Sequence, residues 1–188
     1  MTTHYVDIQL LPDPEFDRKL LLGALYAKLH RALVQLKADD IGVSFPGYQL
    51  QPCSLGDLLR LHGAAPSLQK LLETDWLRGM RDHVALGAIT LTPLDVKHCR
   101  LIRRQFKTSV DRLRRRRMLR KGETLQQAVA AIPDTVERQP NLPHVHIRSY
   151  STNQVFSLFL ERGDPQDELK GGKFNSYGLS AMATVPWF

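Results

Sequence analysis

The most distinctive stretch of the sequence is the basic segment at residues 97–121, KHCRLIRRQFKTSVDRLRRRRMLRK. It holds twelve lysines and arginines and one acid, Asp111, so its net charge is +11. The whole chain carries +7, so the remaining residues together carry −4. The positive charge is therefore concentrated in one segment, and this indicates a local surface for an anionic partner.

The second half of this segment is predicted to be a helix. Thr108 can cap its start, with Asp111 three residues later, and Gly122 is placed to end it. The apolar residues do not gather on one side of such a helix, and arginines point in almost every direction. This helix would gain little by packing on a core and much by lying between phosphates.

A run of arginines is often a solvated surface or a localisation signal. Here the run lies in the middle of the chain and is richer in arginine than in lysine. Guanidinium groups bind phosphates and guanine edges through two parallel hydrogen bonds, which an ammonium cannot do. Nucleic acid is therefore the favoured partner, and an acidic protein or a membrane surface is the second choice.

The whole composition is that of a soluble globular protein, with 188 residues, 43% hydrophobic and 24% charged. The N-terminal residues 1–12 lack the pattern of a signal peptide, and the longest apolar run, 20–27, is too short to cross a membrane. Cys53 and Cys99 form no CxxC pair and predict neither a disulfide framework nor a zinc site. We therefore expect a cytoplasmic protein.

Residues 1–94 are predicted to form an α+β domain. The expected elements are a strand at 4–11, a helix at 15–37, a strand at 41–46, an ambiguous strand or short helix at 57–62, a helix from Ser67 to about Thr74, and a strand at 84–91. The order βαββαβ is typical of the ferredoxin-like fold, with an antiparallel four-stranded sheet and two helices on one face.

Residues 95–188 are predicted to form a smaller C-terminal α/β domain that bears the arginine-rich helix. A second helix is expected at 124–132, opened by Thr124 with Gln127 three residues later and closed by Pro133. Residues 144–149 and 155–160 both fit strands joined by a turn.

Side chains that could carry chemistry give only weak signals on their own. His144 and His146 share one face of a strand, but no third metal ligand accompanies them, so a partly exposed face is the simpler interpretation. His30 lies between core-spaced leucines, Ser149 indicates a turn, and Tyr177 has no pattern around it. From the residues alone, the chain is a basic, two-part, nucleic-acid-binding protein.

The sequence also resembles, over its whole length, the CRISPR repeat-processing endoribonucleases of type I-F systems. The segments that carry the resemblance are HYVDIQLLPDPEF (4–16), KLHRAL (28–33), IGVSFP (41–46), RRQFK (103–107), RLRRRRM (112–118), IPDTV (132–136), RSYSTNQVF (148–156), YGLS (177–180) and VPWF (185–188). Single segments would mean little, but their order and spacing around the arginine-rich helix make the match specific.

This resemblance implies a metal-independent ribonuclease without a cofactor, which binds the hairpin of a CRISPR repeat and cuts at its 3′ base. The enzyme would keep the mature crRNA and join the other subunits of a type I-F surveillance complex, as a monomer on RNA, without a membrane partner. It also implies a ferredoxin-like N-terminal domain and a smaller C-terminal domain with the arginine-rich helix.

The resemblance assigns a role to individual residues. The catalytic residues would be His30, Ser149 and Tyr177. The RNA-binding residues would be Arg103 and Gln105, which read base edges, Phe156, which stacks on the terminal base pair, and Lys107, Arg112, Arg115, Arg116, Arg120 and Ser151. The chain departs from the relatives at Leu119, Arg104 and Tyr150, which bears on the number of phosphate contacts and on the repeat sequence that is recognised.

Two other functions remain open at this point. The same fold could bind a structured RNA without cutting it, or His144 and His146 could belong to a metal-dependent nuclease. In the favoured mechanism, the ribose 2′-hydroxyl attacks the neighbouring phosphate, so the RNA supplies its own nucleophile. Histidine exchanges protons near neutral pH and a serine hydroxyl can hold the 2′-hydroxyl in line, which suits this chemistry.

Overall fold

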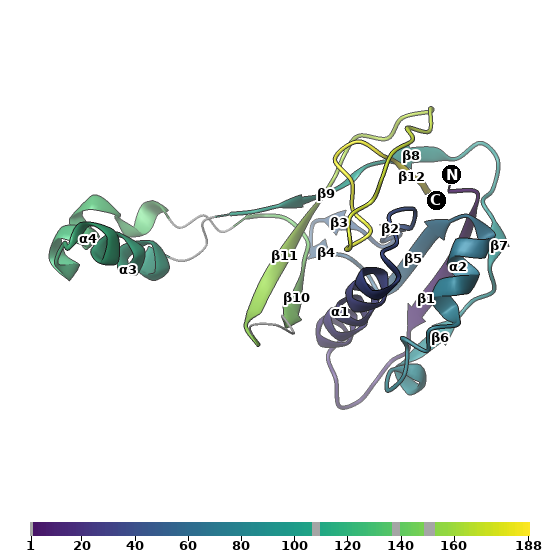
Figure 1. Ribbon diagram of the computed structural model, residues 1–188, viewed down its shortest axis with the longest axis horizontal. Coiled ribbons are helices and arrows are strands. Elements are labelled where there is room, and N and C mark those ends of the chain that lie inside the picture. The colour runs from purple at the N-terminus through teal and green to yellow at the C-terminus, as the bar shows by residue number, and fades with distance from the viewer. Residues whose placement is uncertain (1, 107–109, 137–139, 149–152) are drawn as a thin grey trace. The chain divides into compact units, whose positions relative to one another are not determined.

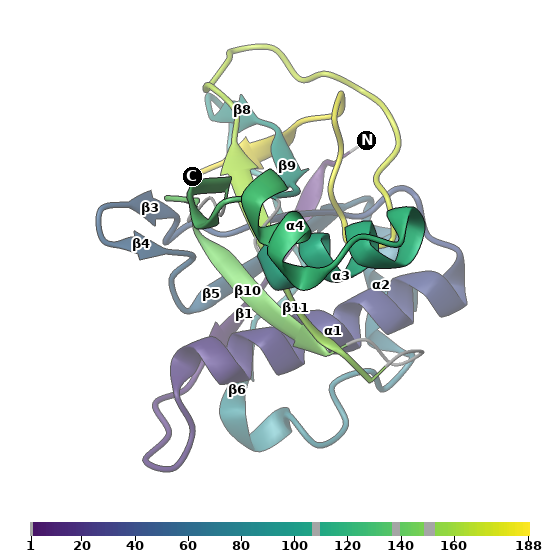
Figure 2. The same ribbon diagram turned by 90° about the vertical axis from the view of Figure 1, so that its left-hand side faces the viewer.

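The computed structural model describes residues 2–106, 110–136, 140–148 and 153–188. The chain forms two compact units, which we call unit 1 (residues 1–104 and 142–188) and unit 2 (residues 105–141). Figure 1 shows the elements of both units, and Figure 2 shows them after a 90° turn. Unit 2 is thus an insertion within the chain of unit 1.

Unit 1 contains twelve strands and two α-helices among its described residues. The strands are β1 (His4–Leu10), β2 (Gly42–Ser44), β3 (Gln49–Leu50), β4 (Cys53–Ser54), β5 (Leu58–Gly63), β6 (Val84–Leu86), β7 (Thr90–Leu91), β8 (Lys97–Cys99), β9 (Leu101–Arg104), β10 (His144–Arg148), β11 (Val155–Arg162) and β12 (Val185–Trp187). The helices are α1 (Arg18–Leu36) and α2 (Ala65–Leu72), followed by a 3₁₀ turn (Arg81–His83). Unit 2 contains α3 (Val110–Lys121), α4 (Leu125–Ala131) and a 3₁₀ turn (Asp134–Val136).

The strands form four sheets. The largest has the order β2-β5-β1-β6, with β7 also paired to β1; the second has the order β10-β11-β9, and the pairs β12-β8 and β3-β4 are two-stranded. Every strand pair in the described part of the chain is antiparallel. The predicted α+β class is confirmed.

Helix α1 lies between the largest sheet and β10, and this position determines where its exposed residues point. Its Leu25 and Leu29 are fully buried, as are Val6 and Ile8 of β1. On the β10 side, Gly23 permits a close approach, because a Cβ atom there would lie 2.2 Å from the carbonyl oxygen of His146. With both of these sides packed, the remaining side of α1 faces solvent.

Three predictions for residues 1–94 need refinement. The ambiguous segment 57–62 is a strand, β5, and the single strand expected at 84–91 is two short strands, both paired with β1. The expected cap Ser67 is wrong: α2 begins two residues earlier, after Ala64, with Pro66 in its first turn. Ser67 lies inside the helix, and its hydroxyl donates to Asp40 over 2.5 Å.

Sequence reasoning missed the strands in the first half of the basic segment. Residues 97–99 pair with the C-terminal strand β12, and residues 101–104 form β9 at the edge of the second sheet. The signal was present, since Cys99 and Leu101 are buried and alternate with basic residues. Arg104 pairs with Glu161 of the neighbouring strand, which lowers the pKa of that carboxyl group.

The chain enters and leaves unit 2 from two strands of the second sheet, at positions that flank the same residue of the strand between them. Arg104, the last residue of β9, and His144, the first residue of β10, are both paired with Phe159 of β11. Within unit 2, α4 has the predicted capping box between Thr124 and Gln127, and Gly122 follows α3 with a φ of 64°. The predicted cap Thr108 lies outside the described residues.

None of the described helices combines the length and the apolar composition that crossing a bilayer requires.

Candidate active site

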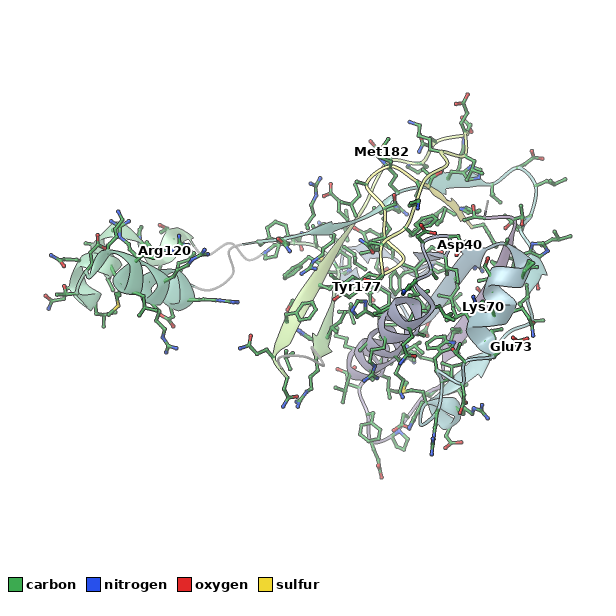
Figure 3. All side chains as sticks on the ribbon, in the orientation of Figure 1. Asp40, Lys70, Glu73, Arg120, Tyr177 and Met182 are labelled. Carbon is green, nitrogen blue, oxygen red and sulfur yellow. The ribbon has the colours of Figure 1, made fainter. Side chains whose placement is uncertain are left out.

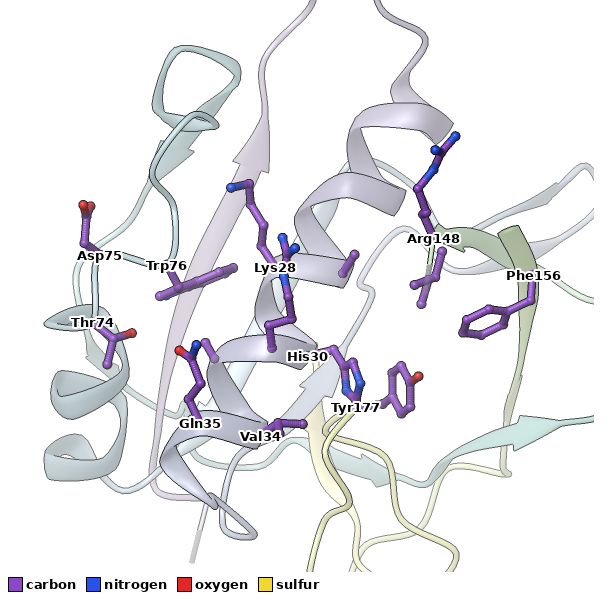
Figure 4. Close-up of a pocket in the computed structure, with 14 residues that line it drawn as sticks. Lys28, His30, Val34, Gln35, Thr74, Asp75, Trp76, Arg148, Phe156 and Tyr177 are labelled. Atoms are coloured by element: carbon purple, nitrogen blue, oxygen red, sulfur yellow. The ribbon is translucent and has the colours of Figure 1, made fainter. Parts of the chain in front are cut away.

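His30 and Tyr177 meet at the exposed side of α1. Their rings are stacked, with 3.9 Å between the ring centroids and 2° between the ring planes. Both side chains are half-buried, so each keeps an edge toward solvent. Figure 3 labels Tyr177 within unit 1, and Figure 4 shows it beside His30.

A tight turn at residues 175–178 holds Tyr177 in place. The side-chain oxygen of Asn175 accepts hydrogen bonds from the backbone N–H groups of Tyr177 (2.9 Å) and Leu179 (3.2 Å), and the Gly178 N–H donates to the Asn175 carbonyl (2.8 Å). Gly178 has a φ of 69°, and a Cβ atom there would lie 2.6 Å from Val43 of β2. The turn therefore requires glycine at this position, where the backbone packs closely against Val43.

The hydrogen bonds of His30 leave one ring nitrogen for chemistry. Its Nδ1 lies 2.9 Å from the backbone carbonyl oxygen of Ser176. A carbonyl can only accept, so Nδ1 carries the hydrogen and Nε2 is the nitrogen that can exchange a proton with a substrate.

Tyr26 supports the same turn from inside the core. Its phenol donates to the backbone carbonyl of Tyr177 over 2.7 Å, and its side chain is fully buried. Burial raises the pKa of the Tyr26 phenol well above its usual value, and the neighbouring Tyr177 phenol raises it further. Tyr26 therefore stays protonated and remains a donor. Sequence reasoning missed the supporting roles of Tyr26, Asn175 and Ser176; only Asn175, before Ser-Tyr-Gly, gave a local turn signal.

Arg103 and Phe156 lie next to this pair of rings. The guanidinium carbon of Arg103 is 5.6 Å from the Phe156 ring centroid and 5.9 Å from that of Tyr177. Both distances are within the range of cation–π attraction, so the two rings hold the cation near the histidine. The structure thus brings together four of the predicted site residues: His30, Tyr177, Arg103 and Phe156.

His30, Tyr177 and Phe156 line a pocket of about 670 Å³. Arg148 and Phe156 line it on one side of His30, whereas Lys28 and Trp76 line it on the other (Figure 4). The pocket is large enough for a small ligand or for part of a polymer.

The arginines of α3 divide into two groups. Arg114 is buried and donates twice to the Ile132 carbonyl (3.0 and 2.8 Å) and once to Asp134 (2.8 Å), and Arg117 pairs with Glu123 (2.5 Å). These two arginines hold unit 2 together. The predicted RNA-binding arginines of α3 are all exposed: Arg112, Arg115, Arg116 and Arg120.

The exposed arginines of α3 share one side of the helix. At 100° per residue, positions 112, 115, 116 and 120 fall within about 140° of one another, opposite the side of Arg114. Leu119 lies in the middle of this cationic side and is 88% exposed, so an apolar side chain interrupts the stripe near its centre.

Some predicted site residues cannot be placed beside the others. Gln105 is exposed and belongs to unit 2. Ser149, Ser151 and Lys107 lie outside the described residues, as does Tyr150.

His144 and His146 lie side by side on β10, with 4.9 Å between their ring centroids. Partial burial lowers the pKa of His144, and His146 lowers it further. His146 shares a hydrogen bond with Ser157 (3.1 Å). In the described part of the chain, no group of three or more His, Cys, Asp or Glu residues could hold a metal ion, so this pair has no third ligand there.

Comparisons with known proteins agree with the resemblance. A family model described as "CRISPR-associated protein (Cas_Csy4)" matches residues 5–188. A "CRISPR-associated endonuclease Cas6/Csy4" of Pseudomonas aeruginosa (strain UCBPP-PA14) is 44% identical over 185 residues, which cover 98% of this chain and 99% of the relative. A protein of the same name from Escherichia coli (strain UTI89 / UPEC) is 42% identical over 186 residues, with 98% and 99% covered.

Proposed function

Since the chain belongs to the Cas_Csy4 family of CRISPR-associated proteins, as the resemblance predicted, we propose that it processes CRISPR repeat RNA. In this proposal it binds the repeat hairpin and cuts at the 3′ base of the stem to give mature crRNA. The observation that carries the proposal is the single available nitrogen of His30, which lies in a pocket beside cationic and aromatic side chains.

The proposed reaction needs no metal ion. The 2′-oxygen attacks the adjacent phosphorus as the bond from phosphorus to the 5′-oxygen breaks, leaving a 2′,3′-cyclic phosphate and a 5′-hydroxyl. His30 Nε2 either takes the 2′-hydroxyl proton or gives a proton to the departing 5′-oxygen. Tyr177 and the Ser176 carbonyl hold the imidazole plane, and Ser149 is proposed to hold the 2′-hydroxyl in line.

RNA affinity is proposed to come mainly from the exposed side of α3. With about six phosphate contacts, affinity would fall on the order of a thousandfold between 50 and 200 mM salt. The proposed contacts come from Lys107, Arg112, Arg115, Arg116, Arg120 and Ser151. Phe156 stacking and base-edge contacts from Arg103 and Gln105 would each add about 1–3 kcal/mol.

The experiment uses a repeat hairpin with a single 2′-deoxy sugar at the cleavage nucleotide. We expect the natural hairpin to be cut in EDTA and the deoxy hairpin to stay intact while still binding. The replacement His30→Gln should abolish cutting, whereas the matched change His146→Gln on β10 should not. Cutting of the deoxy hairpin, or loss of cutting in EDTA, would contradict the mechanism.

The alternative is a subunit that binds the hairpin without cutting it. It predicts a shifted but intact RNA in the same assay, for the natural and the deoxy hairpin alike. The cationic side of α3 serves both functions, but the stacked His30–Tyr177 pair has a use only in the first.

We propose further that the product stays bound and that the protein, a monomer on RNA in the cytoplasm, joins the other subunits of a type I-F surveillance complex. Product release can be measured by mixing the cut complex with excess unlabelled hairpin. Slow exchange over many cleavage half-lives supports retention, and rapid exchange contradicts it.

The first sheet is proposed to be a ferredoxin-like sheet, with the division of roles at residue 94. The strand order β2-β5-β1-β6 supports it, since α1 connects the first two of these strands in the chain, β1 and β2, and α2 connects the last two, β5 and β6. Residues 1–94 would then supply His30, and residues 95–188 would supply the RNA-binding side chains.

A further inference from the structure

The pocket at His30 extends across α1, away from Phe156. At 100° per residue, His30 and Lys28 lie at opposite edges of the exposed side of α1, with Arg31 and Val34 between them. All four line the same pocket, and so do Thr74, Asp75 and Trp76. Figure 4 shows Trp76 on the far side of α1 from Phe156. A chain seated at His30 can therefore continue over α1.

The charge along this extension is positive. Arg31 is exposed, and the ammonium group of Lys28 donates to the Arg78 carbonyl over 2.6 Å. An ammonium has three N–H groups, so this bond fixes its position and leaves two donors. Among the described residues that line the pocket, Asp75 is the one acid; it pairs with Arg81 over 2.5 Å, and this pairing offsets its charge.

The extension also offers apolar surface beside the cations. Val34 is 51% exposed, and Trp76, which is otherwise buried, also lines the pocket. Cations that alternate with apolar surface suit a single nucleic-acid strand, because phosphates and bases alternate along it in the same way.

We propose that this extension holds the single-stranded RNA on the 3′ side of the scissile phosphate. The inference rests on the proposed function, in which the cut lies at the 3′ base of a hairpin. The stem is then on the 5′ side of the cut, where Arg103 and Phe156 are placed to meet it. The unpaired strand leaves on the other side, and Arg31 and Lys28 are the cations that its next phosphates meet.

The test compares two hairpins that carry a 2′-deoxy sugar at the cut. One ends one nucleotide beyond the cut, and the other has a tail of about ten nucleotides. Their affinities for the full chain are measured at 50 and 200 mM salt. Each phosphate contact to a single strand contributes about 0.7 to the salt slope, so two contacts make the tail's advantage fall about sevenfold over this range.

The variant Lys28→Gln/Arg31→Gln should remove the advantage of the tail and leave binding of the short hairpin unchanged. The control Arg18→Gln changes an exposed arginine on the same helix that does not line the pocket, and it should keep the tail's advantage. Thermal melting of each variant shows whether it is folded.

The outcomes separate this inference from the proposed function. If the natural short hairpin is cut but the tail gives no advantage to the unchanged protein, the inference is wrong and the proposed function stands. The inference is also wrong if the double variant keeps the full advantage. If no natural hairpin is cut, the proposed function fails, and the binding comparison still decides whether the tail contacts α1.

Discussion

Arg114 and Arg116 lie two residues apart on α3, yet we expect their replacement by alanine to have opposite effects. Arg114 is buried and makes two hydrogen bonds to the Ile132 carbonyl, whereas Arg116 is exposed and has no ion pair within the described ranges. The change at 114 should therefore destabilise unit 2, and the change at 116 should weaken RNA binding.

The size of the first effect follows from the contacts. Hydrogen bonds from a charged donor contribute about 1.5–3 kcal/mol. The ion pair with Asp134 adds little, because the Asp134 side chain is 88% exposed. We therefore expect the change to destabilise unit 2 by about 2 kcal/mol, which corresponds to about a 30-fold larger open population.

Native-state amide exchange of the full chain measures this population directly. In Arg114→Ala, amides of α3 and α4 should exchange about 30-fold faster. In Arg116→Ala they should exchange at the original rate, while the salt slope of hairpin binding falls by about one. Equal acceleration in both variants, or none in Arg114→Ala, would refute this division of roles.

Three further predictions concern unit 1. Gly178→Ala should destabilise the protein by about 1–2 kcal/mol because of the φ of 69° alone, and the close contact with Val43 should add to this loss. Urea unfolding at pH 7 measures the change, and an unchanged midpoint would contradict the reasoning. Burial lowers the pKa of the His62 imidazole to about 3, from 6.5, so the unfolded chain binds this proton more readily as the pH falls below about 6.5. Protonation of the unfolded His62 should then lower the stability by about 2–3 kcal/mol between pH 7 and 4.5. His62→Gln should lose that part of the pH dependence, and an identical pH profile would count against the reasoning. Arg103→Ala should reduce discrimination between hairpin sequences by about 1–3 kcal/mol, whereas Arg116→Ala should weaken all hairpins alike, as a panel of stem variants would reveal.

Local pattern was enough to predict the elements whose periodicity is simple. The alternation of β1, the long helix α1 and the capping box at Thr124 all agree with the sequence-based expectations. The strands β8 and β9 were missed because their basic residues suggested a solvated segment, although Cys99 of β8 and Leu101 of β9 are buried. The basic residues indicated the exposed positions of these strands correctly, but they outweighed the weaker signal from the buried ones.

The pairing of His30 with Tyr177 could not follow from any local signal. The hydrogen bond between His30 and Ser176 joins residues 146 positions apart, and no periodicity reports a contact of that range. Their proposed roles came from the resemblance to a family. The supporting bond from Tyr26 became visible only in the folded chain, because a tyrosine one turn before a histidine fits a core position equally well.

The attachment of unit 2 has a consequence for how this family can change. Arg104 and His144 flank the same residue of β11, so the two ends of the insertion are separated by two strand spacings, about 10 Å. A peptide of about four residues covers such a gap. The residues between them, 105–143, can therefore be exchanged for another segment without changing the strand pairing, so the proposed RNA-binding helix can vary while the proposed active site on unit 1 stays the same.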